Sequence, residues 1–120
     1  MINFSQVASK TLAGCALMAN RKKVSTDIII SEHPEFITIT QFDFANSRQG
    51  EFAVVELAEY ANKYYPCGMS ITNICRQWVE SYDGDIEQAN KDLKASGGCR
   101  VRLERVRTNK GNQFIKVTIL

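Results

Sequence analysis

Hydrophobic and polar residues alternate along one stretch near the middle of the chain, which predicts a β-strand. Ile37 and Ile39 share one parity, whereas Phe42 and Phe44 have the opposite one. A strand accommodates such a change only with a bulge or strong coil near residues 40–41, or by burying both of its faces. We therefore expect an irregular or coiled strand at this position.

Similar patterns predict the other strands, and clusters of turn-forming residues separate them. The turn at 46–50 joins the first strand to the second in a hairpin, and the turn at 108–112 joins the last two. The further strands are expected at residues 52–57, near 59–67, at 99–107 and at 113–120. The face of the last hairpin that should be buried carries Val101, Leu103, Ile115, Val117 and Ile119.

Helical periodicity begins after the third strand. The longest apolar stripe runs from Ile71 to Tyr82 and predicts a helix, with Ser70 placed to cap it. A second helix is expected to begin at Asp85, because Gln88 follows three residues later as in a capping box. It should end at the glycine pair that follows.

The beginning of the chain is less regular. Residues 1–20 fit neither periodicity, which leaves a helix or an added strand open for this segment. Side chains at residues 25–27 can cap a short helical turn, and a short strand is the alternative; either should end by Pro34.

The composition predicts one globular domain that folds alone, because 44% of the 120 residues are hydrophobic and 23% are charged. We expect its core over residues 34–120 and an N-terminal extension over residues 1–30. The formal net charge is only +2, but it is unevenly distributed. Residues 51–93 carry −5 and residues 94–120 carry +6, so an acidic segment precedes a basic one.

The cysteines give no sign of a zinc site or a dithiol redox motif, because no two of Cys15, Cys67, Cys75 and Cys99 form a C-x-x-C pair. Reduced thiols are expected. His33 is the only histidine and lies in a polar turn, so a Cys–His nucleophile is not indicated. The common glycine-rich nucleotide motifs are absent, and we expect no enzyme activity, no metal and no cofactor.

Residues 12–15 match the four-residue lipobox pattern of bacterial lipoproteins. The preceding residues 5–11 are mostly polar, however, and a secretory signal needs about 7–15 apolar residues before its cleavage site. No apolar run approaches the roughly 20 residues that span a bilayer. We therefore expect a cytoplasmic protein with no membrane partner.

The last hairpin concentrates positive charge. Its basic residues are Arg100, Arg102, Arg105, Arg107, Lys110 and Lys116. Arg100 and Arg102 alternate with apolar residues, so a solvated strand face is the favoured explanation for these two and ligand contact is the alternative. Arg105, Arg107 and Lys110 surround a turn, where side chains can converge on a partner. Guanidinium forks bind two phosphate oxygens at once, and about five such charges can displace counterions from a nucleic-acid backbone.

Aromatic side chains would complete such a site, because nonspecific single-strand binders stack bases on them. Phe114 is the best candidate, since it has the opposite parity from the expected buried residues of its strand. Phe42 or Phe44 is displaced toward the outer face if the isoleucines of the first strand face the core. Tyr64 lies in a connection and is a further candidate, whereas Trp78 belongs to the helical stripe and is expected in the core.

The order of these elements over residues 34–120 resembles that of an OB-fold, a five-stranded Greek-key barrel with its helix between the third and fourth strands. The hairpin at 105–120 is similar to the last hairpin of small single-stranded-DNA-binding proteins, including those of phages and mobile elements. The resemblance implies a mainly β fold with an inserted helical segment. It also implies a ligand path between Arg48 in the loop joining strands one and two and Arg107 and Lys110 in the loop joining strands four and five.

The helical segment from Ser70 to Ser96 is longer than the family's single helix and carries much of the acidic charge, so it should face away from a nucleic acid. The leading hypothesis is binding of single-stranded DNA, or RNA, with little sequence preference. The alternative is a protein-interaction module, such as a small phage-type inhibitor or regulator. Its acidic and basic segments would then meet a protein partner, or each other in a homodimer.

Overall fold

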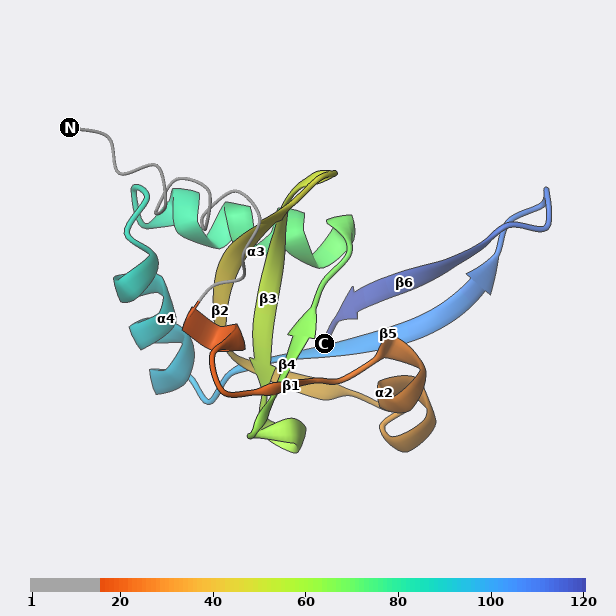
Figure 1. The fold of residues 1–120 in the computed structure, drawn as a ribbon, viewed down its shortest axis with the longest axis horizontal. Helices are drawn as coiled ribbons and strands as arrows, with labels where there is room; N and C mark the ends of the chain where they lie inside the picture. The colour runs from red at the N-terminus through yellow and green to blue at the C-terminus, as the bar shows by residue number, and fades with distance from the viewer. Residues whose placement is uncertain (1–15) are drawn as a thin grey trace.

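Strand β2 lies at the centre of a six-stranded sheet in the computed structural model, which describes residues 16–120 (Figure 1). The strand order is β1-β4-β3-β2-β5-β6. β1 and β4 pair in parallel, and the other neighbours are antiparallel. The strands are β1 (Lys22–Lys23), β2 (Ile37–Ser47), β3 (Gly50–Leu57), β4 (Lys63–Pro66), β5 (Cys99–Arg107) and β6 (Gln113–Ile119).

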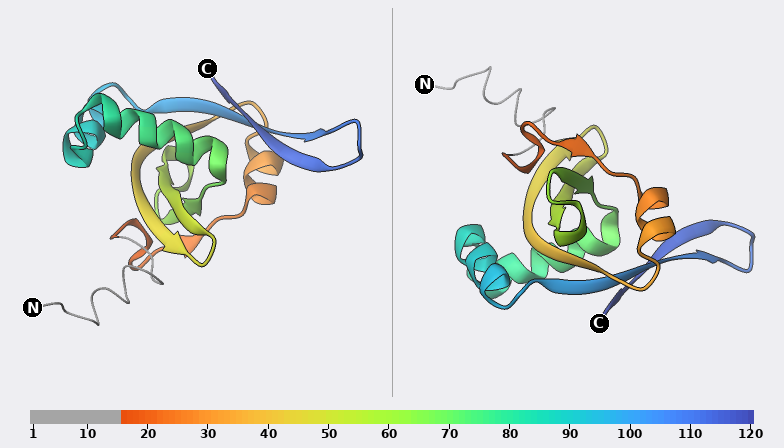
Figure 2. Two further views of the ribbon diagram at one scale, coloured as in Figure 1. Left: turned by 90° about the horizontal axis from the view of Figure 1, so that it is seen from above. Right: turned by 90° about the horizontal axis from the view of Figure 1, so that it is seen from below.

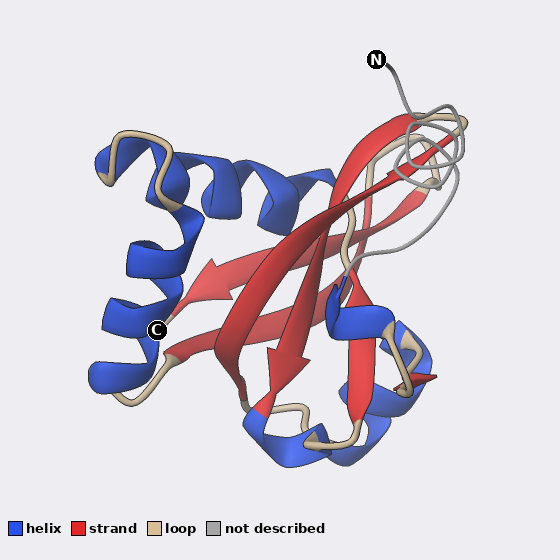
Figure 3. Ribbon diagram, turned by 60° about the vertical axis from the view of Figure 1, so that its left-hand side comes forward, coloured by secondary structure: helices blue, strands red, loops and turns tan. Residues whose placement is uncertain are grey.

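Helices pack around this sheet, and the two longest connect β4 to β5 (Figure 3). The helices are η1 (Ala16–Met18), α2 (Thr26–Glu32), η2 (Ala58–Tyr60), α3 (Met69–Ser81) and α4 (Ile86–Ala95). The expected mainly β fold with a helical segment between the third and fourth strands of the 34–120 region is confirmed. None of the helices between residues 16 and 120 is long and apolar enough to cross a membrane.

Two predicted helix caps are confirmed and one is wrong. Asp85 caps α4 by accepting a hydrogen bond from the Gln88 N–H at 3.1 Å, and Ser25 caps α2. Ser70 lies inside α3 instead of capping it. The extended residue before α3 is Gly68, so the helix begins earlier than the apolar stripe alone indicates.

The expected five-stranded closed barrel is wrong in strand number and in closure. Closure would require β4 to pair with β6, but β1 occupies the outer edge of β4, where Lys22 lies opposite Lys63. The N–H of Val24 extends this contact by donating to the Tyr64 carbonyl at 2.9 Å. The sheet therefore stays open, with β1 and β6 as its edge strands.

The predicted bulge in β2 is confirmed at Thr40. Between Ile39 and Gln41, β2 advances by two residues while β3 advances by one, which leaves Thr40 as the extra residue. This extra residue shifts the parity, so Ile39 and Phe42 both point into the core and are fully buried. The expectation that Phe42 could be displaced toward the outer face is therefore wrong.

The side chain of Asn90 on α4 continues the hydrogen bonding of β2 beyond the bulge. Ile37 and Ile39 pair with β5 through their backbone groups. After the bulge, Phe42 is the next residue of β2 whose N–H and C=O point to this side of the strand, where β5 no longer provides a partner. The Phe42 N–H donates to Asn90 Oδ1 at 2.8 Å, and Asn90 Nδ2 donates to the Phe42 carbonyl at 2.9 Å. The amide thus takes the place of a strand residue and satisfies two backbone groups of the buried Phe42.

Parts of the region before residue 34 belong to the core. Val24 and Ile29 are fully buried against β-sheet residues. On the opposite face of the sheet, η1 helps to cover a second, smaller cluster. This cluster contains Leu17, Met18, Ala45, Phe52, Val54 and Tyr64. Most of the 1–20 segment, for which a helix or an added strand is expected, lies outside the described residues, as do Cys15 and the lipobox-like residues 12–15.

An ion pair fastens the N-terminal region to the bulge. Arg21 donates to Glu56 Oε2 at 2.6 Å, and the Thr40 hydroxyl donates to Glu56 Oε1 at 2.9 Å. Burial alone would raise the pKa of the Glu56 carboxyl, but these hydrogen bonds and the Arg21 charge outweigh it and hold the pKa below its usual value.

Close backbone contact at the junction of α4 and β5 requires a glycine. Gly98 has a φ of +92°, and a Cβ there would lie 2.7 Å from Thr38 Cγ2 and 2.8 Å from the Ile39 carbonyl oxygen. Gly97 has almost the same φ, +90°, but a Cβ there would meet nothing within 4 Å. Substituting Gly97 therefore tests backbone strain alone, whereas substituting Gly98 tests the same strain together with a steric clash.

We predict that Gly97→Ala lowers the free energy of unfolding by about 1 kcal/mol, from backbone strain alone. Gly98→Ala adds a clash with β2 and should lower it by at least about 2 kcal/mol more. Urea denaturation of both variants measures the difference. Equal losses would contradict the close approach of Gly98 to β2.

The Glu56 contacts predict a pH-dependent loss of stability. Because the folded-state pKa lies below the unfolded value, the contribution is present above pH 4.5 and is lost as the pH falls through the folded pKa. Glu56→Gln should therefore lower the free energy of unfolding by about 1–2 kcal/mol at pH 7. The difference from the wild type should shrink toward pH 3. Denaturant melts at both pH values measure it, and a constant difference would contradict the assignment.

Candidate nucleic-acid interface

The β5–β6 hairpin projects from the body of the protein as an arm, defined here as residues 102–118 (Figure 2). β2 begins at Ile37, which lies opposite Val101 on β5. β5 therefore continues past the start of β2 and pairs with β6 on one side. At the tip, the Thr108 N–H donates to the Asn112 carbonyl at 2.8 Å and closes the predicted turn.

The pairing register divides the predicted site residues between two faces of the hairpin, because side chains alternate along each strand. The basic–aromatic face carries Arg100, Arg102, Glu104, Val106, Phe114, Lys116 and Thr118. The opposite face begins with the buried Val101 and Leu103, as predicted, and continues to Arg105 and Arg107 near the tip. Of the expected buried partners on β6, Ile119 is exposed.

Two of the arginines tie the arm to α2 and the turn after it. Arg105 forms an ion pair with Asp27 at the start of α2. Arg102 Nε donates to the Glu35 carbonyl at 3.1 Å. Both contacts lie on the exposed surface, so they position the base of the arm and engage part of its charge internally.

Three cations of the hairpin remain open to solvent. Arg107, Lys110 and Lys116 are exposed and make no ion pair or side-chain hydrogen bond with residues 16–120. Arg100 differs, because its guanidinium lies over the Phe36 ring, 4.9 Å from the ring centre. Arg107 and Lys110 therefore place available charge at the tip of the arm, and Lys116 lies nearer its base, opposite Glu104.

The structure presents one of the three predicted aromatic residues to solvent. Phe114 is 49% exposed and lies opposite Val106 on the basic–aromatic face. Phe44 is half-buried, with its ring in an edge contact with Phe42, 6.0 Å between ring centres. Tyr64 is half-buried in the cluster that η1 covers. Phe44 and Tyr64 thus pack within the body, and neither is presented as Phe114 is.

Arg48 is not brought into contact with the arm. It occupies the two-residue turn between β2 and β3, where Ser47 pairs with Gly50, and its side chain is exposed. Figures 1 and 2 show this turn and the tip of the arm as two separate projections. A ligand touching Arg48 and Arg107 together would have to span the space between them.

The acidic helices lie far from the basic tip. The acidic residues of α3, α4 and the turn between them are Glu80, Asp83, Asp85, Glu87 and Asp92. Figures 1 and 2 show α4 and the tip of the arm at opposite ends of the molecule. This separation matches the expectation that the acidic segment faces away from the basic hairpin.

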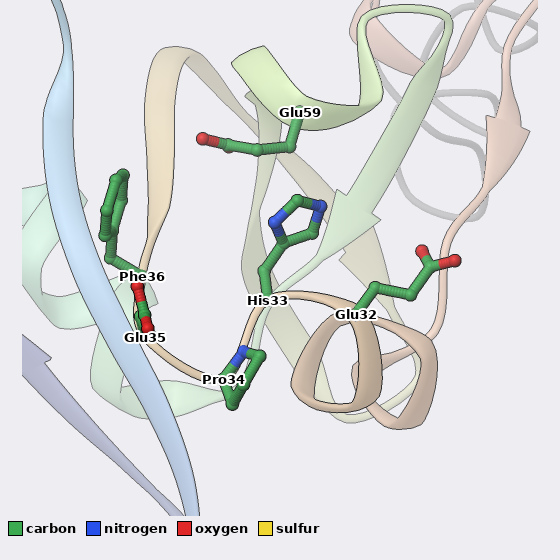
Figure 4. Close-up of a pocket in the computed structure, with 6 residues that line it drawn as sticks. All are labelled: Glu32, His33, Pro34, Glu35, Phe36 and Glu59. Carbon is green, nitrogen blue, oxygen red and sulfur yellow. The ribbon is translucent and has the colours of Figure 1, made fainter.

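A hollow of about 460 Å³ beside α2 is acidic, and two of its three carboxylates already have internal partners (Figure 4). It is lined by Glu32, His33, Pro34, Glu35, Phe36 and Glu59. Glu59 accepts hydrogen bonds from the Thr38 N–H and hydroxyl, and Glu32 accepts one from the Tyr60 hydroxyl at 2.6 Å. The His33 ring packs edge-on against Tyr60. This hollow is therefore poorly suited to an anionic ligand.

The described cysteines are free thiols. Burial raises the pKa of Cys75 to about 12 and that of Cys67 well above its usual value, so both are neutral at physiological pH. Across residues 16–120, no group of three or more His, Cys, Asp and Glu side chains is placed to hold a metal ion.

Comparisons with protein-family models, with curated proteins and with solved structures found no match to this chain. The geometry and charge of the arm are therefore the basis for assigning a function.

Proposed function

We propose that the protein binds single-stranded DNA, or RNA, through the arm and with little sequence preference. The observation that carries the proposal is the exposure, on a single projecting hairpin, of one aromatic ring and of three cations that pair with no other side chain in the described part of the chain. These residues are Arg107, Lys110, Lys116 and Phe114. Cations that follow the phosphates and a ring on which a base stacks are the two components of nonspecific single-strand binding.

The type of side chain on the arm supports a single strand over a duplex. A duplex hides the faces of its bases, whereas a single strand can place a base on the exposed Phe114 ring. Sequence would be read by hydrogen bonds to base edges. The cations and the apolar ring that carry the proposal do not read base edges, so they give a weak sequence preference.

The strand order supports the proposed likeness to an OB-fold. Within the sheet, β4-β3-β2-β5-β6 places the first strand of the 34–120 region at the centre, with the helices inserted between the third and fourth. We infer an OB-like arrangement left open between β4 and β6. Its open seam frees the β5–β6 hairpin to act as the arm. We place the activity in the cytoplasm, where the free thiols stay reduced.

A protein-interaction role is the second candidate, and the apolar outer edge of β6 favours it. Phe114 and Ile119 are both about half exposed on this strand. A partner that covered them would not need the cations at the tip. Charge reversal at the tip therefore distinguishes the two roles.

Reversing charge at the tip should sharply weaken oligonucleotide binding. With three phosphate contacts, the affinity of the wild type should fall about 20-fold between 50 and 200 mM salt. Arg107→Glu combined with Lys110→Glu should weaken binding at least about tenfold at 50 mM salt and flatten this dependence. Fluorescence anisotropy of labelled oligo-dT measures both quantities.

The matched control is Lys91→Glu, which reverses an exposed lysine on α4, far from the tip. It should leave the affinity within about twofold, because at this distance salt screens the charge. Unchanged binding by the tip variant would contradict the proposal. Equally tight binding to a duplex of the same length would contradict the preference for a single strand.

Removing the exposed ring should weaken binding without changing its salt dependence. Phe114→Ala should lower the affinity by about 1–3 kcal/mol, and Phe114→Trp should retain it, because the larger ring still stacks. Ile28→Ala removes an exposed apolar side chain from α2 and serves as the control. Anisotropy with oligo-dT checks all three variants. Equal effects of Phe114→Ala and Ile28→Ala would exclude stacking at this position.

A further inference from the structure

The outer edge of β6 carries backbone hydrogen-bonding groups that pair with no other strand among residues 16–120. The Leu120 N–H donates to the Arg100 carbonyl at 3.0 Å, and the Thr108 N–H donates to the Asn112 carbonyl. Because antiparallel bonding alternates, these two bonds show that even-numbered residues of β6 bond to β5. The odd-numbered residues therefore direct their N–H and C=O groups outward. These are Gln113, Ile115, Val117 and Ile119.

Exposed apolar side chains gather on the same strand. Among the described residues, five large hydrophobic side chains are exposed, and three of them are Phe114 (49%), Ile119 (53%) and Leu120 (54%). Edge strands are normally protected by proline, charge, a bulge or a covering segment. β6 contains no proline, its pairing with β5 is regular, and its single charge is Lys116. Such an edge is suited to pairing with another strand.

We propose that two copies of the chain pair through β6, antiparallel, about a two-fold axis at Val117. A symmetric pair that uses the outward groups must set odd-numbered residues opposite odd-numbered ones, so its axis falls near the middle of the strand, at Ile115, Lys116, Val117 or Thr118. An axis at Ile115 sets Phe114 opposite Lys116 and leaves the exposed Ile119 and Leu120 without a strand residue opposite them. An axis at Lys116 sets the two ammonium groups opposite each other in a closely spaced pair, and this repulsion opposes it.

The axis at Val117 pairs the strand with itself more favourably than the other three. Lys116 then lies opposite Thr118 of the second copy, and Phe114 lies opposite Leu120. Ile115 lies opposite Ile119, and the outward groups form about six hydrogen bonds. An axis at Thr118 leaves Phe114 without a cross-strand partner. The apolar residues that are exposed in one copy therefore become cross-strand pairs between two.

This pairing also fits the distribution of charge. Antiparallel arms point in opposite directions, so the two basic tips with Arg107 and Lys110 lie at opposite ends of the pair. The two-fold axis is perpendicular to the joined sheet, which places both basic–aromatic faces on one side. Two hairpins then form one continuous four-stranded surface. One strand pair is smaller than a standard interface, so the dimer should dissociate on dilution.

Sedimentation velocity of the full chain, without nucleic acid, tests the pairing between about 1 and 300 µM. The wild type should form a concentration-dependent dimer. Val117→Pro removes an outward N–H while sparing the bonds to β5, so it should raise the dissociation constant at least about tenfold. Ile28→Lys introduces a charge at an exposed apolar position on α2 and should leave the dimer unchanged.

A charge swap tests the register. Phe114→Lys and Leu120→Glu should each weaken the dimer, because each sets a charge against an apolar side chain. The double variant should restore it, because each introduced lysine then faces an introduced glutamate of the other copy.

A wild type that stays monomeric throughout, or a dimer that survives Val117→Pro, overturns the proposal. A double variant that stays monomeric overturns the Val117 register. Because no nucleic acid is present, these outcomes are independent of whether the arm binds one.

Discussion

The hydrogen bonding along one edge of β2 determines the shape of the whole protein. Three residues of this edge pair with β5, and after the bulge at Thr40 the Asn90 amide of α4 takes over at Phe42. α4 is thereby fastened to the second half of the strand, and Gly98 brings the chain back against its first half. β5 then runs past the start of β2, and its hairpin with β6 becomes an arm.

Local patterns predicted most of the elements because their causes are local. The parity change in β2 predicted its bulge, and Asp85 predicted the start of α4. The place of β1 was not predictable, because two exposed lysines carry no strand signal and their partners on β4 lie 41 residues further along the chain. This contact occupies the edge that barrel closure needs. Asn90 likewise resembles any polar residue on a helix, although it replaces a strand.

The same distinction applies to the candidate site. The charge of the last hairpin and the exposure of Phe114 follow from composition and strand parity, so the sequence predicted both. The pairing of Arg105 with Asp27 and the burial of Tyr64 depend on residues distant in the chain. Tertiary packing thus leaves Arg107 and Lys110 at the tip of the arm and Lys116 nearer its base as the available cations.

The most direct test of this account is an NMR titration of isotopically labelled protein with oligo-dT, followed by backbone amide shifts. The account predicts that the largest changes fall between Arg107 and Lys116 and saturate together. Changes centred on the β2–β3 turn around Arg48, with the arm unaffected, would contradict it.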